Sequence, residues 1–242
     1  MDMSSLTITN IPAIMRSHRF DNGARLMEIW FSRPPAIAPA YGSPETSTIR
    51  MDGWALTFSR AKQVYDQLMK DKIWANAPAQ KEIAAMLRRK GLLIPGPGSR
   101  SFGNLNNSVQ LQDADYINQR TVGFGISDLD DMSAALGNFS FRVLVSGSVT
   151  ATTTTGASEY RVTITEVGVY IRDSYDFNGD QFLGFWDDSD NSISMINPLS
   201  GVAAYNSDFR DWRKNNGMGG DFIVFSDIKR TVLATPDTFI IK

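Results

Sequence analysis

The sequence predicts a single α+β domain in which a helical N-terminal part precedes a β-rich C-terminal part. Apolar side chains recur with the period of an α-helix between about residues 11 and 91, and they alternate with polar ones in parts of residues 120–242. The chain has 242 residues, of which 42% are hydrophobic and 11% aromatic, so it can bury a core of its own. We therefore expect one domain, residues 1–242, with helices packed on a curved, mainly antiparallel sheet.

Three helices are predicted in the N-terminal part. The first begins near Asp21 and ends before Pro34, because proline lacks an amide donor and clashes with the preceding helical turn. The second follows Asp52, where apolar residues are spaced by four, three, four and three positions. The third begins at Pro78 and ends at Gly91, and its last turn contains three cations that complement the helix dipole, Arg88, Arg89 and Lys90.

The segment from Pro95 to about Asn118 is polar and irregular, which favours a long surface loop. A short helix is predicted from Ser127 to Leu136, because Gly137 follows it as a terminator. No internal repeat or linker divides the chain into two independent folds.

The strongest β signal lies in two consecutive segments that a polar connection, residues 150–158, separates. Phe139–Val149 alternates apolar and polar residues, as expected of a strand with one buried face. In Glu159–Arg172 the apolar residues shift from even to odd positions, so we expect a β-bulge near Glu166 or Gly168, and we expect the two strands to pair. Four shorter strands follow: Phe182–Trp186, Asp221–Phe225, Thr231–Ala234 and Thr238–Ile241.

The residue types that are missing exclude several classes of chemistry. With no cysteine, the chain has no disulfide, no thiolate nucleophile and no cysteine-ligated zinc. Its single histidine, His18, rules out a two-histidine metal site within one chain. The formal net charge of −2 argues against general binding to nucleic acid, so no nucleic-acid partner is expected.

Residues 1–5 lack the basic and apolar regions of a secretory signal peptide, and no apolar run is long enough to span a bilayer. We therefore expect a chain that is made in the cytoplasm without a signal peptide or a transmembrane segment. Any later export requires a route that does not read such a signal.

Carboxylates and an amide are concentrated between Asp173 and Asp180, next to the end of a predicted strand. Such oxygen ligands suit Mg²⁺, and two neighbouring carboxylates can also divide into an acid and a base. Asp176, Asn178 and Asp180 have the spacing of the first ligands of a calcium loop, so Ca²⁺ is the alternative, although Gln181 stands where that loop needs glycine. The predicted metal ligands are Asp173, Asp176, Asn178 and Asp180. A plain polar turn has the same composition, and both interpretations stay open.

A second candidate site lies in the segment Asp208–Lys214. Arg210 and Arg213 stand beside aromatic residues there, and an arginine can bind phosphate or carboxylate through its fixed fork of donors. The alternative is a salt-bridged loop that leads into the strand near Phe222. The acidic segment Asp187–Asn191 is best explained as a solvated turn, and His18, between two arginines, as a surface residue.

Four segments spread over the chain carry a broad resemblance: Ile11–Arg16, Trp54–Leu56, Glu166–Asp173 and Gly219–Phe222. In these segments the chain resembles an uncharacterised bacterial family found in type VI secretion contexts. That resemblance implies a link to secretion and transfers no activity.

The six residues Asp173–Asn178 read Asp-Ser-Tyr-Asp-Phe-Asn. They look like the Asp-x-Tyr-Asp element of the colicin M family, whose members use magnesium to cut the pyrophosphate of lipid II in the periplasm and fold as a half-open β-barrel with helices. The resemblance implies that Asp173, Tyr175 and Asp176 are the catalytic residues. The family's His-Arg pair after this motif is missing here, and Arg210 and Arg213 are the candidates to replace it.

Together, the two resemblances imply an antibacterial type VI secretion effector, a toxin that hydrolyses a lipid II-like peptidoglycan precursor in the periplasm of the target cell. In this hypothesis Asp173 and Asp176 hold Mg²⁺ or activate water, Tyr175 orients the substrate, and the two arginines neutralise the pyrophosphate. A cognate immunity protein and a secretion-machine carrier are the expected protein partners. The alternative is a non-catalytic adaptor or structural component of a secretion or phage-like machine.

Overall fold

The computed structural model describes residues 6–125, 127–152 and 159–242, so most of the predicted polar connection, residues 153–158, lies outside it. The fold is mixed α+β with open, mainly antiparallel sheets, as the sequence predicts. Contacts between residues group the chain into two compact units, each assembled from three segments. Unit 1 contains Met1–Ile49, Gly123–Phe139 and Arg172–Phe225, and unit 2 contains Arg50–Val122, Ser140–Ile171 and Ser226–Lys242. The units therefore do not coincide with the helical and β-rich parts of the sequence.

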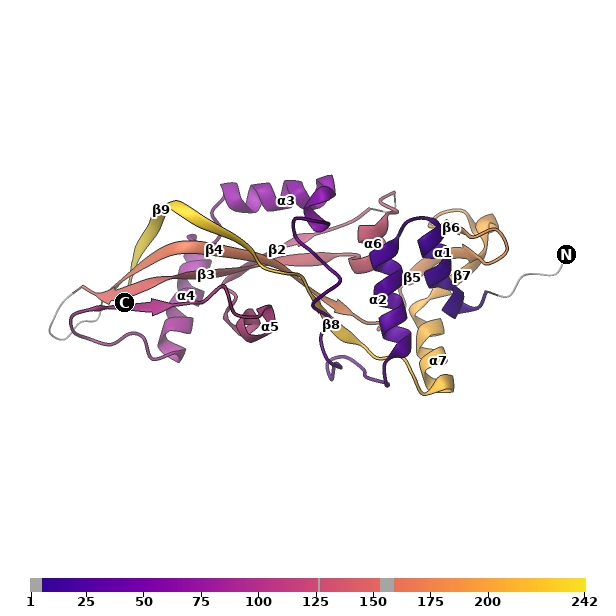
Figure 1. Ribbon diagram of the computed structural model, residues 1–242, viewed down its shortest axis with the longest axis horizontal. Helices are drawn as coiled ribbons and strands as arrows, with labels where there is room; N and C mark the ends of the chain where they lie inside the picture. Colours follow the sequence, from indigo (N-terminus) through magenta and orange to yellow (C-terminus); the bar gives the residue numbers. More distant parts are fainter. Residues whose placement is uncertain (1–5, 126, 153–158) are drawn as a thin grey trace. The chain divides into compact units, whose positions relative to one another are not determined.

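The sheet of unit 2 is built around two long strands, β3 (Phe139–Ala151) and β4 (Tyr160–Tyr175). These strands pair with each other, which confirms the predicted pairing (Figure 1). On β3 the further partners are β1 (Ser99–Phe102) and β2 (Asn118–Val122), and on β4 the further partner is β9 (Lys229–Ile241). The alternating burial of the first half of β4 and the continuous burial from Val167 to Ile171 place the core of unit 2 against this sheet.

The pairing of β4 with β9 is irregular where the sequence predicts a bulge. Ile164 pairs with Asp237 and Glu166 pairs with Val232, so two steps along β4 correspond to five steps along β9. In this pairing the additional residues thus lie in β9 and not, as predicted, in β4, and Pro236 of β9 cannot donate a ladder hydrogen bond. This interruption also explains why the sequence pattern predicts two strands where the structure has the single strand β9.

Two helices of unit 2, α3 (Ser59–Lys70) and α4 (Ala77–Arg89), contact the sheet through β2, and α4 also contacts β9 (Figure 1). Helix α4 is the third predicted helix, and the side chain of Asn76 caps it by accepting the amide of Ala79. Helix α3 begins later than the predicted start near Asp52. The preceding residues form turns and the short helix η2 (Ala55–Thr57), and the amide of Met51 binds the carboxylate of Asp227 instead of continuing a helix.

The predicted loop after Pro95 contains regular structure. Besides β1, it forms the short helices α5 (Val109–Gln112) and η3 (Asp113–Asp115). Asp113 accepts hydrogen bonds from Tyr170 at 2.5 Å and from Arg142 at 2.8 Å. These hydrogen bonds to distant residues fix the segment after Pro95, whose own sequence shows neither a helical nor a strand pattern.

Unit 1 begins with η1 (Ile8–Asn10), α1 (Ile11–Ser17) and α2 (Asp21–Ser32), and α2 packs on α6 (Asp131–Leu136) (Figure 1). The close approach of α2 to α6 depends on Gly23, because a Cβ atom there would lie 2.8 Å from the Cβ of Ala134. Asp130 caps α6 by accepting the amide of Ser133 at 2.9 Å. The first predicted helix and the short helix before Gly137 are therefore present, the latter with a later start.

The rest of unit 1 consists of a small sheet, a helix and one more strand. The sheet has the order β6-β5-β7, with β5 (Phe182–Asp187), β6 (Ser192–Ser194) and, after η4 (Pro198–Ser200), β7 (Val202–Tyr205). Helix α7 (Asn206–Asn216) follows, and β8 (Phe222–Phe225) pairs with the end of β4. The alternative prediction of a loop at Asp208–Lys214 is wrong, because α7 buries Asn206, Phe209 and Arg213 on one helical face.

No helix in the described ranges is long and apolar enough to cross a membrane.

Replacing Gly147 by alanine tests the pairing of β3 with β4. A Cβ atom on Gly147 would lie 1.9 Å from the carbonyl oxygen of Thr163, so we expect Gly147→Ala to reduce the free energy of unfolding by about 2–3 kcal/mol. Gly53→Ala is the matched control, because the nearest atom to its added Cβ is 4.0 Å away, and its effect should stay within about 0.5 kcal/mol. Urea unfolding measures both, and equal stability of the two variants would contradict this packing of β3 on β4.

Candidate functional site

A cavity of about 320 Å³ in unit 1 is lined by the whole segment Asp173–Asn178. Small-molecule sites begin at about this size. Most of the remaining wall is apolar and comes from α1, α2, α6 and the small sheet, including Met15, Met27, Leu183 and Trp186. The cavity therefore combines the segment Asp173–Asn178, hereafter the acidic segment, with a mostly apolar wall.

The residues Asp173, Ser174 and Tyr175 are the end of strand β4. They pair in register with Val224, Ile223 and Phe222 of β8, so only the residues from Asp176 onward leave the sheet. The prediction that Asp173 already belongs to a turn is therefore wrong. Because a strand paired along its edge is stiffer than a turn, the side chains of this segment have fixed directions.

A chain of hydrogen bonds connects Tyr41, Ser174 and Asp176. The Ser174 hydroxyl donates to Oδ2 of Asp176 at 2.7 Å, and the Tyr41 hydroxyl lies 2.6 Å from the Ser174 oxygen. A serine hydroxyl has a single hydrogen, which here goes to Asp176, so Tyr41 is the donor in the second bond. The other oxygen of Asp176 accepts the amide of Asn178 at 3.1 Å.

Burial raises the pKa of Asp173 well above the usual range of a carboxyl group. The negative charge of Asp176 raises this pKa further, while the amide of Ser174 and the charge of Arg172 act in the opposite direction. Burial, and the charge of Asp173, also raise the pKa of the Tyr175 hydroxyl, whose ring stacks on Phe222 at 5.1 Å. A carboxyl group that resists ionisation in a cavity is typical of functional sites.

The four predicted metal ligands do not converge. Asn178 and Asp180 are exposed, and Asp180 lies 3.2 Å from Arg210. In the part of the chain that the structure describes, no group of three or more His, Asp or Glu side chains is placed to hold a metal ion. Asp173 and Asp176, however, both line the cavity, and their charges repel each other.

The first predicted phosphate-binding arginine, Arg210, binds the turn that follows β4. Its guanidinium donates to the carbonyl oxygens of Phe177, at 2.8 Å, and Gly179, and to the carboxylate of Asp180. The side-chain amide of Asn206, at the start of α7, donates to the carbonyl of Asn178 at 2.6 Å. Helix α7 thus fixes the loop that carries the second half of the acidic segment.

The second predicted arginine, Arg213, forms a buried ion pair with Asp221. Its guanidinium lies 3.0 Å from the carboxylate, and the two side chains are 7% and 0% exposed. The indole of Trp30 donates to the same carboxylate at 2.9 Å, and the amide of Ala38 donates to it at 3.1 Å. Among the described residues that line the cavity there are three aspartates and no Lys, Arg or His, so neither arginine faces it.

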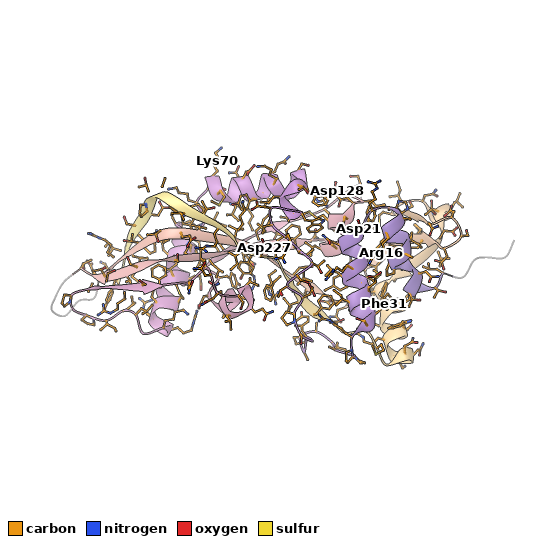
Figure 2. The ribbon with its side chains drawn as sticks, viewed as in Figure 1. Arg16, Asp21, Phe31, Lys70, Asp128 and Asp227 are labelled. Carbon is orange, nitrogen blue, oxygen red and sulfur yellow. The ribbon has the colours of Figure 1, made fainter. Side chains whose placement is uncertain are left out.

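An aromatic cluster of unit 1 anchors the segment next to the cavity. Phe177 stacks on Phe209 of α7 at 3.9 Å and meets the edge of Trp30 at 4.8 Å. Phe31, labelled on α2 in Figure 2, stacks on Phe209 at 5.7 Å and contacts Trp212. The phenylalanine after the Asp-Ser-Tyr-Asp element is therefore a core residue.

Two site residues, Tyr41 and Asp128, are absent from the sequence prediction. Tyr41 belongs to a proline-containing loop, and 133 residues separate it from Ser174. Asp128, labelled in Figure 2, lines the cavity and accepts the amide of Gly125 at 2.7 Å. Neither residue stands in a spacing pattern, so no signal in the sequence marks it.

The remaining sequence candidates are surface features. Asp188 accepts hydrogen bonds from the amide of Thr7 and from Asn10, and Asp187 accepts from Ser189, as in an ordinary polar turn. His18 is exposed, and its ring lies 2.8 Å from the carbonyl oxygen of Asn191.

Comparison with known families gives one match, described as a family of unknown function (DUF6402), over residues 6–204 and 200–241. The chain belongs to this family. No curated protein and no solved structure matches the chain. The resemblances to a type VI secretion family and to colicin M therefore stay predictions.

Replacing Arg213 separates a structural role from a substrate-binding one. Arg213→Ala leaves the buried carboxylate of Asp221 without its cation, so we expect the free energy of unfolding to fall by about 3–5 kcal/mol. Lys214→Ala is the control, because Lys214 is the next residue of α7 and is exposed. A thermal melt of Arg213→Ala that equals that of the control would show that the ion pair does not stabilise unit 1.

The raised pKa of Asp173 predicts a pH-dependent stability difference. A carboxyl group whose pKa is higher in the folded than in the unfolded state contributes stability that is fully present below its unfolded pKa and is lost as the pH rises through the folded pKa. Asp173→Asn removes the group that must ionise, so the variant should be at least as stable as the parent at pH 7. Its advantage should shrink as the pH falls towards 4. Melting curves at several pH values measure this, and a variant that is less stable at pH 7 than at pH 4, relative to the parent, would contradict it.

Proposed function

We propose that this protein is a hydrolase whose active site is the cavity at Asp173–Asn178. The observation that carries the proposal is the coincidence, in one cavity, of the Asp-Ser-Tyr-Asp segment with a carboxyl group that burial holds in an unfavourable environment. The proposed substrate is the pyrophosphate of a lipid II-like envelope precursor, and the biological role is that of a type VI secretion toxin that acts in the target periplasm.

The charge and the wall of the cavity support this substrate class. A pyrophosphate facing three aspartates is repelled unless a divalent cation lies between them, which agrees with the magnesium dependence predicted from the sequence. The apolar wall, with Met15, Met27 and Trp186, suits the hydrocarbon end of a lipid-linked substrate. A lipid-linked pyrophosphate has both features.

Asp173 and Asp176 are the proposed ligands of Mg²⁺, which when bound supplies a Lewis acid at a phosphoryl oxygen. A neighbouring cation favours the charged form of a carboxyl group, so it offsets the effect of burial and of Asp176 on the pKa of Asp173. Tyr175 is buried against Phe222 and shapes the wall of the cavity. Arg210 and Arg213 support the site by fixing the loop after β4 and the start of β8.

The second candidate function is a non-catalytic adaptor of a secretion or phage-like machine. The contacts of Arg210 and Arg213 favour it. Both arginines were expected to bind substrate, but they bind other residues of unit 1 instead. In that case the acidic segment is the end of a strand and a turn, and its charge has no catalytic use.

Expression in two compartments distinguishes these functions. Directed to the periplasm of a Gram-negative host, the parent should lyse cells and deplete lipid-linked precursors, while cytoplasmic expression should be tolerated. The reason is access, since the headgroup of the proposed substrate is displayed outside the inner membrane. Viable counts and extracted precursor lipids are the measurements.

The variants Asp173→Asn and Asp176→Asn should each abolish the lysis, because they preserve shape and remove the negative charge that the cation needs. Asp211→Asn, on the exposed side of α7, is the matched control and should kill like the parent. If Asp173→Asn kills as well as the parent, the hydrolase proposal fails. If the parent is harmless in both compartments, the adaptor is the better account.

A further inference from the structure

A loop of unit 1 presents apolar side chains to solvent beside the cavity. This apolar loop, Met195–Val202, joins β6 to β7 through η4 (Figure 1). Ile196 is 73% exposed, Leu199 93% and Val202 40%. Single exposed apolar side chains are ordinary on a protein surface, whereas several gathered in one short loop mark an interaction site. We propose that the apolar loop inserts into the surface of a lipid bilayer and thereby holds the cavity at the membrane.

The lack of charge in and around the apolar loop fits a lipid partner. No Asp, Glu, Lys or Arg occurs between Asp190 and Asp208, although these residue types make up 21% of the whole chain. A charged side chain is costly to move into hydrocarbon, so the loop can enter the bilayer without that cost. Val232, an exposed apolar residue of β9, stands instead two positions from Arg230.

The backbone amides of the apolar loop already have acceptors nearby. The amides of Ile196 and Asn197 donate to the hydroxyl oxygen of Ser194, at 3.3 and 2.9 Å. The amide of Leu199 donates to the side chain of Asn197 at 3.0 Å, the amide of Ser200 donates to its carbonyl at 3.1 Å, and the proline between them has no amide. Because a backbone group without a partner is costly in lipid, these bonds favour insertion of the loop.

Backbone contacts also fix the end of the apolar loop against β5. The Ser192 hydroxyl donates to the carbonyl of Ser200 at 3.0 Å. Gly201 follows with a φ of 145°, and a Cβ atom there would overlap the carbonyl oxygen of Trp186, so the close approach requires glycine. The loop is therefore ordered while its apolar side chains are in solvent, which lowers the entropic cost of binding.

The apolar loop continues the wall of the cavity. Ile193 of β6 and Met195, the first residue of the loop, both line the cavity, and Ile196 follows directly. The hydrocarbon end of a lipid-linked substrate stays in the bilayer, so an enzyme reaches the headgroup from the membrane surface. Insertion of the loop brings the cavity to that surface. This inference rests on the proposed function, because it assumes a lipid-linked substrate.

The acidic turn Asp187–Asn191 determines which lipids suit the apolar loop. The turn is next to the loop, because Ser192 follows it directly and binds Ser200. Its carboxylates repel anionic headgroups, so we expect insertion into neutral lipid. Binding through apolar side chains should also be insensitive to salt, unlike binding through charges.

A second copy of the chain is less suited to cover the apolar loop. A stable dimer buries about 800 Å² of each partner, which is more than a single short loop supplies.

Vesicle binding by the purified full chain tests the inference. The probe is a vesicle of phosphatidylcholine and phosphatidylethanolamine, and flotation measures the bound fraction. Leu199→Ser should lower the partition coefficient roughly tenfold, and adding Ile196→Ser should lower it further, because each change removes an apolar side chain from the bilayer. Val232→Ser is the matched control and should bind like the parent, since Val232 is 76% exposed but lies outside the loop. Thermal melts show that each variant is folded.

The absence of cysteine from the chain allows a second readout at one position. Leu199→Cys is labelled with nitrobenzoxadiazole, a fluorophore whose emission rises and shifts to the blue in lipid. We expect this change with neutral vesicles at low and at high salt. The same fluorophore on Val232→Cys should not respond.

Four outcomes overturn the inference. The first two are no binding of the parent to neutral vesicles, and equal partition of the parent and the Ile196→Ser, Leu199→Ser double variant. The third is binding only to phosphatidylglycerol vesicles that high salt reverses. The fourth is a dimer of the parent that the double variant abolishes, without vesicle binding, which assigns the loop to a second copy.

The failure of this inference is distinguishable from that of the proposed function. If the parent binds vesicles through the apolar loop but releases no headgroup from a lipid-linked pyrophosphate, the membrane contact stands and the hydrolase proposal fails. If the parent cuts that substrate in detergent solution and does not bind vesicles, the hydrolase remains and the membrane contact is wrong.

Discussion

The carboxylate of Asp221 is the constraint on which the rest of unit 1 depends. It is fully buried, and it accepts hydrogen bonds from Trp30 of α2, from Arg213 of α7 and from the amide of Ala38. A buried carboxylate is costly unless it is paired and hydrogen-bonded, so the helices and the loop that supply these donors are fixed relative to one another. Strand β8 begins at the next residue and pairs with the end of β4. The position of Asp173 in the cavity therefore follows in part from a charge that lies outside the cavity.

The same arrangement explains how a cavity rich in carboxylates persists in a stable fold. Asp173 is held where ionisation is unfavourable, and Asp176 adds a like charge nearby. The aromatic cluster around Phe177 and the ion pair of Arg213 offset the free-energy cost of placing these two carboxyl groups close together. Both fix the loop and the strand on either side of the acidic segment. The residues that stabilise unit 1 are thus different from those proposed for the chemistry. A divalent cation at Asp173 and Asp176 would reduce the repulsion between the two carboxylates.

Patterns within one element were predictable, and pairings between distant elements were not. The period of the third helix and the alternation of Phe139–Val149 give α4 and β3, because each pattern reports one buried face. Helix α7 could not be predicted in this way, because one of its buried residues is Arg213. An arginine is expected at the surface unless its buried partner, here Asp221, is known. The hydrogen bond from Trp30 to Asp221 joins residues that are 191 positions apart, so no local pattern predicts it. The acidic segment could be found by composition, but the hydrogen bond between Ser174 and Tyr41, which are 133 positions apart, could not.

Release of the phosphorylated headgroup from a purified lipid-linked pyrophosphate tests most directly whether the Asp-Ser-Tyr-Asp cavity breaks a phosphate anhydride bond, as we propose. Parent and Asp173→Asn are compared at pH 7 with millimolar Mg²⁺, and again after chelation with EDTA. We expect release by the parent with Mg²⁺ only, and no release by Asp173→Asn, although the melting temperature of this variant should be at least that of the parent. Equal release by the two proteins, or no release by the parent under any of these conditions, would contradict it.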